Sequence, residues 1–588
     1  CSCSLEAVPR PRPRSAPPTP VTPAASLAAS PPLRRPAPPV RPPPRAPMNA
    51  APLSLTGARW CLRPIDDAAF ARARAHGLPD AATRVLAARG FDAEAGVLSP
   101  SLSHLHDPGT MHGMDAAVRR LHDARARGER IRVVTDYDVD GTTSSLILQA
   151  ALSRVAPELT LDHHIPDRFT EGYGFSVQAA EAAARDGVGL IVTADIGVRD
   201  HAAIAAARTA GVDVLVCDHH LPDGADVPDD AIVLCPPQPA CDYPNRHLAA
   251  CGVSLKLAEA LLDDDPIRDR FRDSLLKLAA IGTVADLVPL RTLENRAIVR
   301  AGLDRLNAGG HSPGLTALLA ASDATPGTLD ESTIGFRIGP RINAAGRMAR
   351  ATHVIDLLTT RDPIRARQLA GALDGFNRDR RAVQGRLVDT VLTGLGSDPP
   401  AFVLAHGAEA DGWHRGVVGI VAARVRDTVH RPVAIAAIAG DRAVGSVRSV
   451  PGIHAVEALD TAADLLDRYG GHPTAAGFTV PVAHLDALQE RLDTAAQAQS
   501  ARPVGPTHDV DAEVRPDELT DALYGALRRL APFGQGNPAP VLQVTGARLD
   551  RVTRFGQTGG HLKARVATGT GSLEVVWWGE GDRVDDLA

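Results

Sequence analysis

The chain has 588 residues, a length that exceeds one hydrophobic core and predicts roughly three or four domains. Hydrophobic residues make up 44% and aromatic residues 3%, which fits a globular protein and excludes a nucleic-acid surface built from many stacked rings. The formal charge of −6 excludes a uniformly basic protein, although a polyanion can still bind in a locally basic groove. No segment has the roughly 18 consecutive apolar residues of a membrane span.

The first 47 residues are rich in proline and arginine and lack an apolar signal segment, which predicts a disordered tail over residues 1–50. Because the chain opens on cysteine, Met48 is a candidate start, and both an extraneous extension and a functional tail remain open. Seven cysteines are scattered without CxxC spacing. This favours free thiols in a reducing cytoplasm over a metal site at Cys235 and Cys241.

Strands and helices are expected to alternate from about residue 130. The runs IRVVTD, GVGLIVTAD and VDVLVCD are rich in valine and isoleucine, and helical segments rich in alanine separate them. Apolar runs of this kind are typical of parallel strands covered on both faces. The runs end in Asp136, Asp195 and Asp218. Because ligands bind beyond the carboxyl ends of parallel strands, the three carboxylates predict a site at one edge of a sheet.

The first of these aspartates begins a pattern with the spacing of a calcium loop. Asp136, Asp138 and Asp140 alternate, and Gly141 follows. An EF-hand loop needs a glutamate at its twelfth position and a helix before it. The twelfth position is Ile147, and a valine-rich strand precedes the loop, so the sequence excludes an EF hand.

Two interpretations remain, a solvated acidic turn and a metal site. Like charges packed at the end of a buried strand repel each other unless a cation lies between them. Asp218, His219 and His220 follow another strand end and add imidazoles to the carboxylates. Such donors without paired thiols suit Mn, Mg or Zn, and two ions about 4 Å apart can activate a water and stabilise a phosphoryl transition state. We therefore favour the metal site.

Further along the chain, residues 296–395 look mostly helical, with an irregular GFRIGPRINAAGRM segment inside. A second α/β unit begins with AFVLAH near residue 401, and QAQSARPVGPT (497–507) has the composition of a linker. Short runs such as PVLQVTGARL and LEVVWWG then predict a small β domain.

Four segments, TDYDVDGTTSS, TADIG, CDHH and AAIGTVADLVPL, resemble the four motifs of the DHH phosphoesterase superfamily, in order. The segments IPDRFTEGYGFS, ENR (294–296), FRIGPRINAAGRM, WHRGVVGIVAARV, GSVRSV, GGHPTAAGF and LAPFGQGNPAP further resemble the RecJ family of bacterial single-strand-specific 5′→3′ DNA exonucleases. The resemblance runs from about residue 57 to the C-terminus. It implies a metal-dependent exodeoxyribonuclease that releases 5′-mononucleotides in DNA repair and recombination.

The resemblance also implies two divalent ions, Mn²⁺ or Mg²⁺, that direct a hydroxide at the phosphodiester. The implied catalytic ligands are Asp138, Asp140, Asp195, His219, His220 and Asp286. Asp136 and Asp218 complete the expected metal site.

A second DHH tripeptide, Asp162-His163-His164, could compete for the metal on spacing alone. The family places hydrophobic or aromatic residues at this point, so we interpret the tripeptide as coincidental. The alternative is that His164 lines the site.

The second α/β unit resembles the DHH-associated domain and, with the helical segment before it, carries the candidate substrate-binding residues. These are Arg341, Asn343, Arg347, His414, Ser446, Arg448, Gly470, Gly471 and His472. Glycines permit close approach of phosphate, and arginine and histidine supply charge-assisted hydrogen bonds. The alternatives are structural: a Gly-Gly turn with His472 capping a helix, interdomain salt bridges in PRINAAGR, and Trp413 as a core anchor instead of a substrate contact beside His414.

The C-terminal β domain resembles an OB fold, which binds single strands through a basic groove and stacking. Its basic residues are Arg548, Arg551, Arg554, His561 and Lys563. Trp577 and Trp578 are neighbours in an expected strand, so one should face the core and the other solvent. We expect a truncated barrel, because the family continues for several strands beyond this point.

These features predict an α/β multidomain protein whose parts are a tail (1–50), a DHH parallel-sheet domain with an N-terminal extension (51–300), a helical connector (301–395), a smaller α/β DHH-associated domain (396–498) and an incomplete OB-like domain (499–588). The resemblance further implies a cytoplasmic monomer that works with a helicase and a single-strand-binding protein. Alternative functions are a nanoRNA or cyclic-dinucleotide phosphodiesterase, a pyrophosphatase, and a non-catalytic DNA-binding scaffold of the Cdc45 type. The PRINAAGR segment and OB-like tail argue against the first two, and the intact ligand positions argue against the scaffold.

Overall fold

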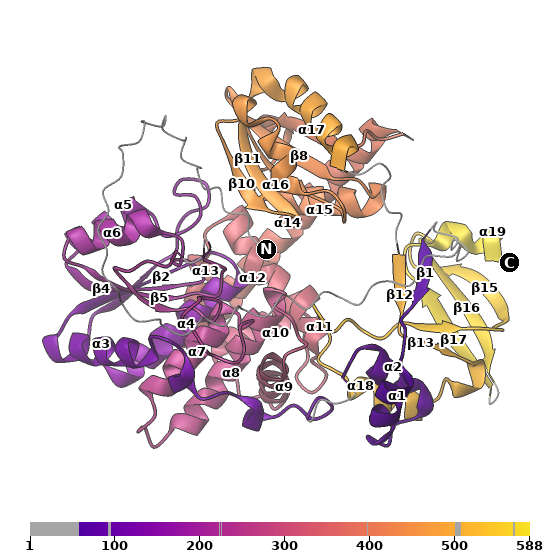
Figure 1. Ribbon diagram of the computed structural model, residues 1–588, viewed down its shortest axis with the longest axis horizontal. Helices are drawn as coiled ribbons and strands as arrows, with labels where there is room; N and C mark the ends of the chain where they lie inside the picture. Colours follow the sequence, from indigo (N-terminus) through magenta and orange to yellow (C-terminus); the bar gives the residue numbers. More distant parts are fainter. Residues whose placement is uncertain are drawn as a thin grey trace, which may run out of the picture.

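The computed structural model describes residues 58–91, 96–222, 224, 226–396, 398–499, 507–568 and 571–587. The predicted tail, Met48 and most of the predicted linker lie outside the described residues. Figure 1 shows two α/β units and a C-terminal β domain, with a group of helices between them. Among the described helices, none is both long and apolar enough to cross a bilayer.

The first α/β unit is built on a five-stranded sheet in the order β3-β2-β4-β5-β6, in which every neighbouring pair is parallel. Its strands are β2 (Arg130–Thr135), β3 (Leu161–His164), β4 (Val188–Ala194), β5 (Asp213–Cys217) and β6 (Ile232–Leu234). This confirms the predicted parallel sheet. Successive residues face opposite sides, so Val133 and Val134 lie in different hydrophobic cores.

Helices cover both faces of this sheet (Figure 1). One face carries α3 (Met114–Arg127), α4 (Val139–Val155), α7 (Ala250–Leu261) and α8 (Arg268–Ala285), and the other α5 (Val177–Arg185) and α6 (His201–Thr209). Capping side chains begin two of these helices, because Asp138 accepts from the Gly141 N–H and Ser176 from the Ala179 N–H.

A group of helices connects the two α/β units. It consists of α9 (Leu293–Asn307), α10 (Pro313–Ala321), α11 (Glu331–Thr333), the π-helix η3 (Ile334–Ile338), α12 (Gly339–Met348), α13 (Thr352–Thr359) and α14 (Pro363–Leu395). The 33 residues of α14 span roughly 50 Å and reach from the connector core into the core of the second unit.

The segment GFRIGPRINAAGRM, which we expected to be irregular, is helical. Pro340 lies two residues after the π-helix η3, within a run of helix that continues from Glu331 to Met348, and its missing N–H coincides with this wider helical turn. Gly339 faces the end of α8, and a Cβ there would lie 3.6 Å from the Ala285 Cβ. Gly339 therefore allows close packing between helices, and neither Gly339 nor Pro340 ends the helix.

The second α/β unit has a mixed sheet in the order β10-β11-β9-β8-β7, in which only β7 and β8 are parallel. Its strands are β7 (Val403–Ala408), β8 (Val433–Ala439), β9 (Arg442–Arg448), β10 (Arg468–His472) and β11 (Ala475–Pro481). Its helices are α15 (Val418–Val429), α16 (Ala455–Asp460) and α17 (Leu485–Gln499).

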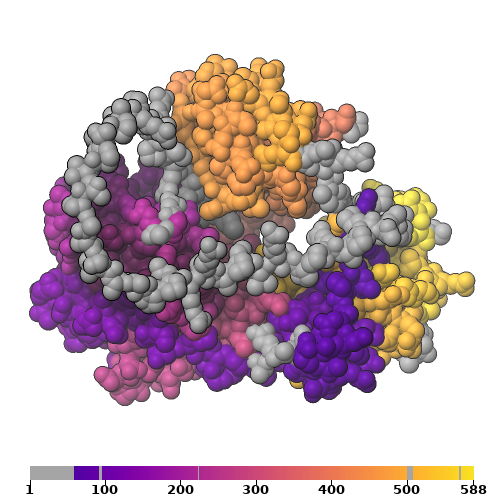
Figure 2. All heavy atoms as spheres, in the orientation of Figure 1, coloured from indigo at the N-terminus to yellow at the C-terminus, as the bar shows by residue number. Residues whose placement is uncertain are grey.

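The N-terminal segment packs against the C-terminal domain (Figure 2, indigo against yellow). Strand β1 (Arg59–Leu62) pairs in parallel with β12 (Thr507–Val510), across nearly the whole length of the chain. The surrounding elements are α1 (Asp67–Arg74), α2 (Asp80–Ala88), β13 (Ala512–Val514), α18 (Asp521–Arg528) and β14 (Leu542–Val544). The start of the C-terminal domain therefore lies next to the N-terminal segment.

The rest of the C-terminal domain is an antiparallel sheet in the order β15-β16-β17. Its elements are β15 (Leu549–Phe555), β16 (His561–Thr568), β17 (Gly571–Trp577) and α19 (Val584–Leu587). Short 3₁₀ helices elsewhere span Leu102–His104, Pro108–Thr110, Glu409–Asp411, Ala463–Leu465, Val482–His484, Pro516–Glu518 and Gly581–Arg583. Trp577 is half-buried and Trp578 is 68% exposed, which fits the expected division between core and solvent.

Candidate metal centre

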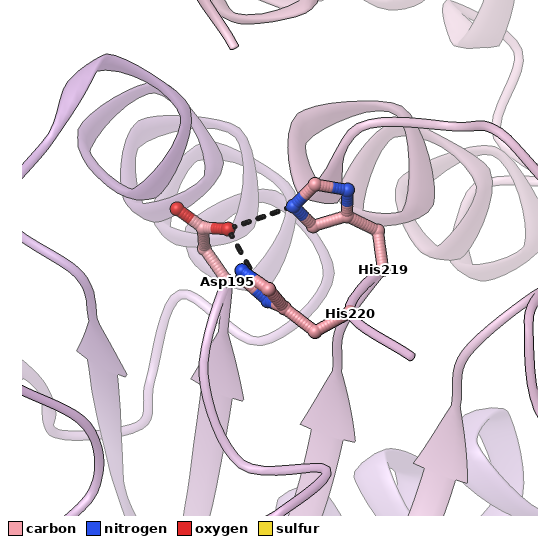
Figure 3. A group of neighbouring side chains, drawn as sticks. All are labelled: Asp195, His219 and His220. Carbon is pink, nitrogen blue, oxygen red and sulfur yellow. Dashed lines mark hydrogen bonds and ion pairs between the residues drawn. The ribbon is translucent and has the colours of Figure 1, made fainter. Parts of the chain in front are cut away.

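Acidic and histidine side chains meet at the carboxyl edge of the parallel sheet. Asp136, Asp195 and Asp218 each follow directly after a strand. Figure 3 shows Asp195, His219 and His220 grouped beyond the strand ends. A fourth carboxylate, Asp286, comes from outside the sheet, because it is the C-cap residue of α8.

Seven of these side chains form three overlapping groups in which the possible ligand atoms all lie within 4.8 Å of one another. The groups are Asp136, Asp138 and Asp195; Asp195, His219 and His220; and Asp140, His219 and Asp286. Asp195 and His219 each belong to two groups, so the three form one continuous cluster. Every member is a residue that the sequence had singled out.

Asp136 supports a bound cation most directly. Its side chain is fully buried, and neither carboxylate oxygen has a hydrogen-bond partner of normal geometry among the described residues. Burial, and then the charge of Asp138, raise the pKa of Asp136 to about 8. A buried carboxylate without donors is costly unless a cation compensates it, so this site fits a hard divalent ion.

Asp140 is held in place by the start of helix α7. Its carboxylate accepts from the Ala250 N–H at 2.7 Å and from the Cys251 N–H at 2.9 Å. Burial, Asp286 and Asp138 raise its pKa well above the ordinary value despite these donors. Gly141 allows the close packing, since a Cβ there would lie 2.4 Å from the Asp136 carbonyl oxygen.

Asp218 lies behind the cluster and orients His220. It accepts from the backbone N–H groups of Val198, His219 and His220, and its Oδ1 lies 2.8 Å from Nδ1 of His220. Burial would raise the pKa of Asp218, but His220 and these hydrogen bonds lower it below its ordinary value. A carboxylate bonded to the far nitrogen of a histidine is the usual support of a metal-ligating imidazole.

His219 lies at the centre of the cluster, with Nε2 3.1 Å from Oδ1 of Asp195 and 3.7 Å from Oδ2 of Asp286. Burial lowers the pKa of His219. The imidazole therefore favours its neutral form, which is the form that binds metals.

The cluster opens into a cavity of about 280 Å³ between the two α/β units. Asp138 and Asp286 lie in its wall. Four of the predicted substrate-binding residues also line it, namely Asn343, Arg347, Ser446 and Arg448. Burial, and then the charge of Arg168, lower the pKa of Arg347 to about 9. Several partly desolvated guanidinium groups close together form a binding site for an anion such as phosphate.

Sequence reasoning missed three arginines and two tyrosines of this cavity, Arg168, Arg415, Arg468, Tyr137 and Tyr173. Each lies within or beside a segment already singled out, such as IPDRFTEGYGFS or WHRGVV. The side chain of Arg168 stacks over the Tyr137 ring at 4.2 Å, which fixes both at the mouth of the metal cluster.

The other predicted substrate-binding residues are not among those lining the cavity. Arg341 turns to Asp374 on α14, with Nη2 3.0 Å from Oδ1, and donates to the Arg337 carbonyl, so its salt bridge lies within the helical connector and not between domains. Gly470, Gly471 and His472 lie within β10, so the Gly-Gly pair is part of a strand and does not turn the chain.

Packing places Trp413 and His414 differently. Trp413 is 9% exposed and lies in the core of the second α/β unit, where a Cβ at Gly407 would meet its ring. His414 contacts the Phe169 ring, with ring centroids 5.6 Å apart, and its Nδ1 accepts from the Gly416 N–H. His414 therefore joins the two α/β units near the cavity without lining it.

The second DHH tripeptide lies on the edge strand β3, apart from the cluster. Asp162 is bound by Arg130 and Arg132, and His164 lies 2.9 Å from Glu171. None of the metal-holding groups in the described chain contains a residue of this tripeptide. His164 lines a separate cavity of about 330 Å³ that shares Tyr137 and Arg168 with the first.

Three family models match the chain: the DHH family N-terminal domain over residues 130–283, the DHHA1 domain over 401–498 and the RecJ OB domain over 510–588. The fold and the cluster at the sheet edge therefore define a protein of the DHH class, with its associated domain.

Relatives narrow the class further. The single-stranded-DNA-specific exonuclease RecJ of Dickeya dadantii is 35% identical over 79% of this chain and 84% of its own length, and that of Bacillus subtilis is 35% identical over 85% of this chain and 63% of its own length. The chain also matches the crystal structure of RecJ from Thermus thermophilus in complex with Mn²⁺, with a TM-score of 0.76 at 32% identity. The match covers 89% of this chain and 74% of the crystallised one. The chain belongs to the RecJ family.

Proposed function

We propose that this protein is a metal-dependent exonuclease that degrades single-stranded DNA from the 5′ end to 5′-mononucleotides. The observation that carries the proposal is the arrangement of the site, in which the carboxylate–histidine cluster opens directly into an arginine-lined cavity. A phosphodiester bound by the arginines would lie next to the metal ligands. The names of the relatives support single-stranded DNA as the substrate.

Two divalent ions, Mn²⁺ or Mg²⁺, would be held by the cluster. Asp136, Asp138 and Asp195 would hold one ion, and Asp140, His219 and Asp286 the other. His220 lies beside Asp195 and would complete the coordination. When bound, the ions supply a water of lowered pKa as nucleophile and stabilise charge on the phosphate. Relatives crystallised with Mn²⁺ and with Mg²⁺ support the choice of ion.

The side chains of the cavity wall would bind and orient the substrate. The guanidinium groups of Arg347 and Arg448 would neutralise phosphate oxygens, and Asn343 and Ser446 would add hydrogen bonds. Gly470, Gly471 and His472, together with His414, would make contacts at the border of the cavity. Asp218 would keep His220 in the tautomer that presents Nε2 to the metal.

The C-terminal domain offers a place for more of the strand. Trp578 is 68% exposed, and its ring meets those of Phe555 and His561 at centroid distances of 5.5 and 4.9 Å. Exposed aromatic clusters on OB-like sheets stack against the bases of single strands in a way that tolerates any sequence. Arg551 on β15 and Lys563 on β16, which also pair with Asp550 and Glu574, would attract the backbone.

The family resemblance supports a cellular setting for this activity. The protein would act as a monomer in the cytoplasm, in DNA repair and recombination. A helicase and a single-strand-binding protein would supply and present the strand.

The test compares a long 5′-labelled single strand, a 3′-labelled single strand and a dinucleotide, each with Mn²⁺ and with EDTA. We expect labelled mononucleotide at once from the 5′ label and a ladder of shortened strands from the 3′ label, only with metal. Asp138→Ala should abolish both, whereas Asp162→Asn, in the second DHH tripeptide, should retain them. Cleavage of the dinucleotide alone would contradict the proposed substrate, and activity in Asp138→Ala would contradict the metal assignment.

A further inference from the structure

The loop that follows Asp286 is held by the C-terminal domain. Residues 287–291 join α8 to α9. The backbone N–H of Leu290 donates to the Gln535 carbonyl at 2.7 Å. The Leu290 side chain is buried beneath Gly534, where a Cβ would lie 2.8 Å from its Cδ1. The C-terminal domain thus rests directly on the loop that leads away from a proposed metal ligand.

The backbone of this loop is strained at its first residue. Leu287 has a φ of +63°, in the left-handed region that side chains rarely adopt. Such a conformation costs about 1–3 kcal/mol and persists only where the surrounding structure imposes it. The Leu287 side chain is 57% exposed, so its own packing does not stabilise this backbone conformation. The restraint therefore comes from α8 on one side and from the docked residues after it on the other.

Arg296 bonds the loop and the C-terminal domain simultaneously. Its side chain is fully buried on α9 and donates to backbone carbonyls on both sides of the joint. One terminal nitrogen donates to the Leu290 carbonyl at 3.2 Å, and the other donates to the carbonyls of Val97 at 2.8 Å and Leu530 at 2.9 Å. One guanidinium thus joins the metal-site loop, the N-terminal segment and the C-terminal domain.

Buried asparagines make each side of this joint rigid. Asn295 donates to the carbonyls of Pro289 and His247, at 3.0 and 2.7 Å. Across the interface, Asn537 donates to the carbonyls of Leu530 and Pro532, both at 2.9 Å. Asn537 therefore shares the Leu530 carbonyl with Arg296, and Asn295 holds the residue next to Leu290. The motifs ENR and LAPFGQGNPAP form this joint, and the proposed chemistry has no other use for them.

We propose that docking of the C-terminal domain onto residues 287–291 positions Asp286, with Arg296 as the positioning residue, so that the proposed metal site is complete only in the docked state. The inference rests on the proposed function, because it takes Asp286 as a metal ligand. Its consequence is that the part of the protein proposed to bind the strand also completes the centre proposed to cut it.

The first test measures Mn²⁺ binding to the full chain by the electron paramagnetic resonance signal of free Mn²⁺. Arg296→Met removes the bonds to both surfaces, and we expect it to weaken one of the two Mn²⁺ sites by about 10- to 100-fold, as loss of a supporting residue typically does. Arg120→Met is the matched control, because Arg120 is a buried arginine of the same domain that binds Glu129 and Asp213 away from the cluster. It should lower the melting temperature but leave both Mn²⁺ affinities within twofold.

The second test uses the wild-type protein and does not depend on a variant that folds. Because coupling between two sites is reciprocal, Mn²⁺ should tighten the joint if the joint positions Asp286. Hydrogen exchange should slow on addition of Mn²⁺ in peptides that cover residues 287–291 and 530–537. Peptides from β15 to β17 should exchange as before.

The outcomes separate this inference from the proposed function. If the wild-type protein binds no Mn²⁺, the proposed metal site fails. If it binds two ions, but a folded Arg296→Met binds both with wild-type affinity, the positioning role is refuted and the metal site stands. If Arg296→Met does not fold, the exchange experiment decides, and unchanged exchange at 530–537 refutes the inference.

Discussion

Replacing Asp136 by asparagine should stabilise the metal-free protein while removing its response to Mn²⁺. The carboxylate is fully buried, lacks hydrogen-bond partners of normal geometry among the described residues and lies next to Asp138. Without a cation, the folded protein keeps this group protonated because its pKa is raised from 3.8 to about 8. The unfolded chain ionises it freely at neutral pH, so the group opposes folding there.

The magnitude follows from that difference. One pKa unit corresponds to about 1.4 kcal/mol, so at pH 7 the penalty on the free energy of unfolding is about 4 kcal/mol. The asparagine amide is also buried without partners, which costs about 1–3 kcal/mol and leaves a net gain of about 1–3 kcal/mol. At about 2–4 °C per kcal/mol for a domain of 150–250 residues, the melting temperature should rise by several degrees.

The assay is thermal unfolding of the wild type and Asp136→Asn in EDTA and in Mn²⁺, at pH 7 and at pH 4. In EDTA at pH 7 the variant should be the more stable protein, and in Mn²⁺ the wild type should overtake it. The advantage of the variant should shrink at pH 4, because the unfolded wild-type chain is then largely protonated too.

The control is Asp162→Asn, in the second DHH tripeptide. Two arginines bind Asp162 and hold its pKa below the ordinary value against the effect of burial. This change should lower the melting temperature equally in both buffers. The reasoning is refuted if Asp136→Asn is less stable than the wild type in EDTA at pH 7 by the same margin as in Mn²⁺.

Two further substitutions test the surroundings of the cluster. Asp218→Asn should reduce Mn²⁺ affinity and exonuclease activity by about 10- to 100-fold without abolishing them, because Asp218 supports His220 through a hydrogen bond. Titration with Mn²⁺ should then restore part of the rate. Arg347→Met should raise KM for single-stranded DNA by about 10- to 100-fold, because it removes one charged hydrogen bond worth about 1.5–3 kcal/mol. The control is Arg341→Met: Arg341 lies on the same helix but pairs with Asp374, so this change should alter KM little. Equal effects of the two arginine changes would contradict the assignment of the cavity as the phosphate site.

The sequence by itself determined the parallel sheet and the cluster at its edge. Strand ends are local features, and parallel strands bring their carboxyl ends together, so Asp136, Asp195 and His219 could be expected to meet before any packing was known. Ile147, where an EF-hand loop needs a glutamate, excluded an EF hand on equally local grounds. The second DHH tripeptide was interpreted as coincidental because the family places hydrophobic or aromatic residues at this point. Its position on the edge strand β3 agrees with that interpretation.

Only the tertiary structure decided which side chains share the site and which support it. Arg341 and Arg347 lie six residues apart on one helix, yet one faces Asp374 and the other the cavity, because neighbouring helices fill different sides of α12. The pairing of β1 with β12, and the burial of Arg296 against carbonyls more than 230 residues away, depend on contacts that local patterns do not encode. Strand ends are dictated by short-range pattern and backbone geometry, whereas interdomain joints depend on long-range packing, and for that physical reason only the folded chain reveals them.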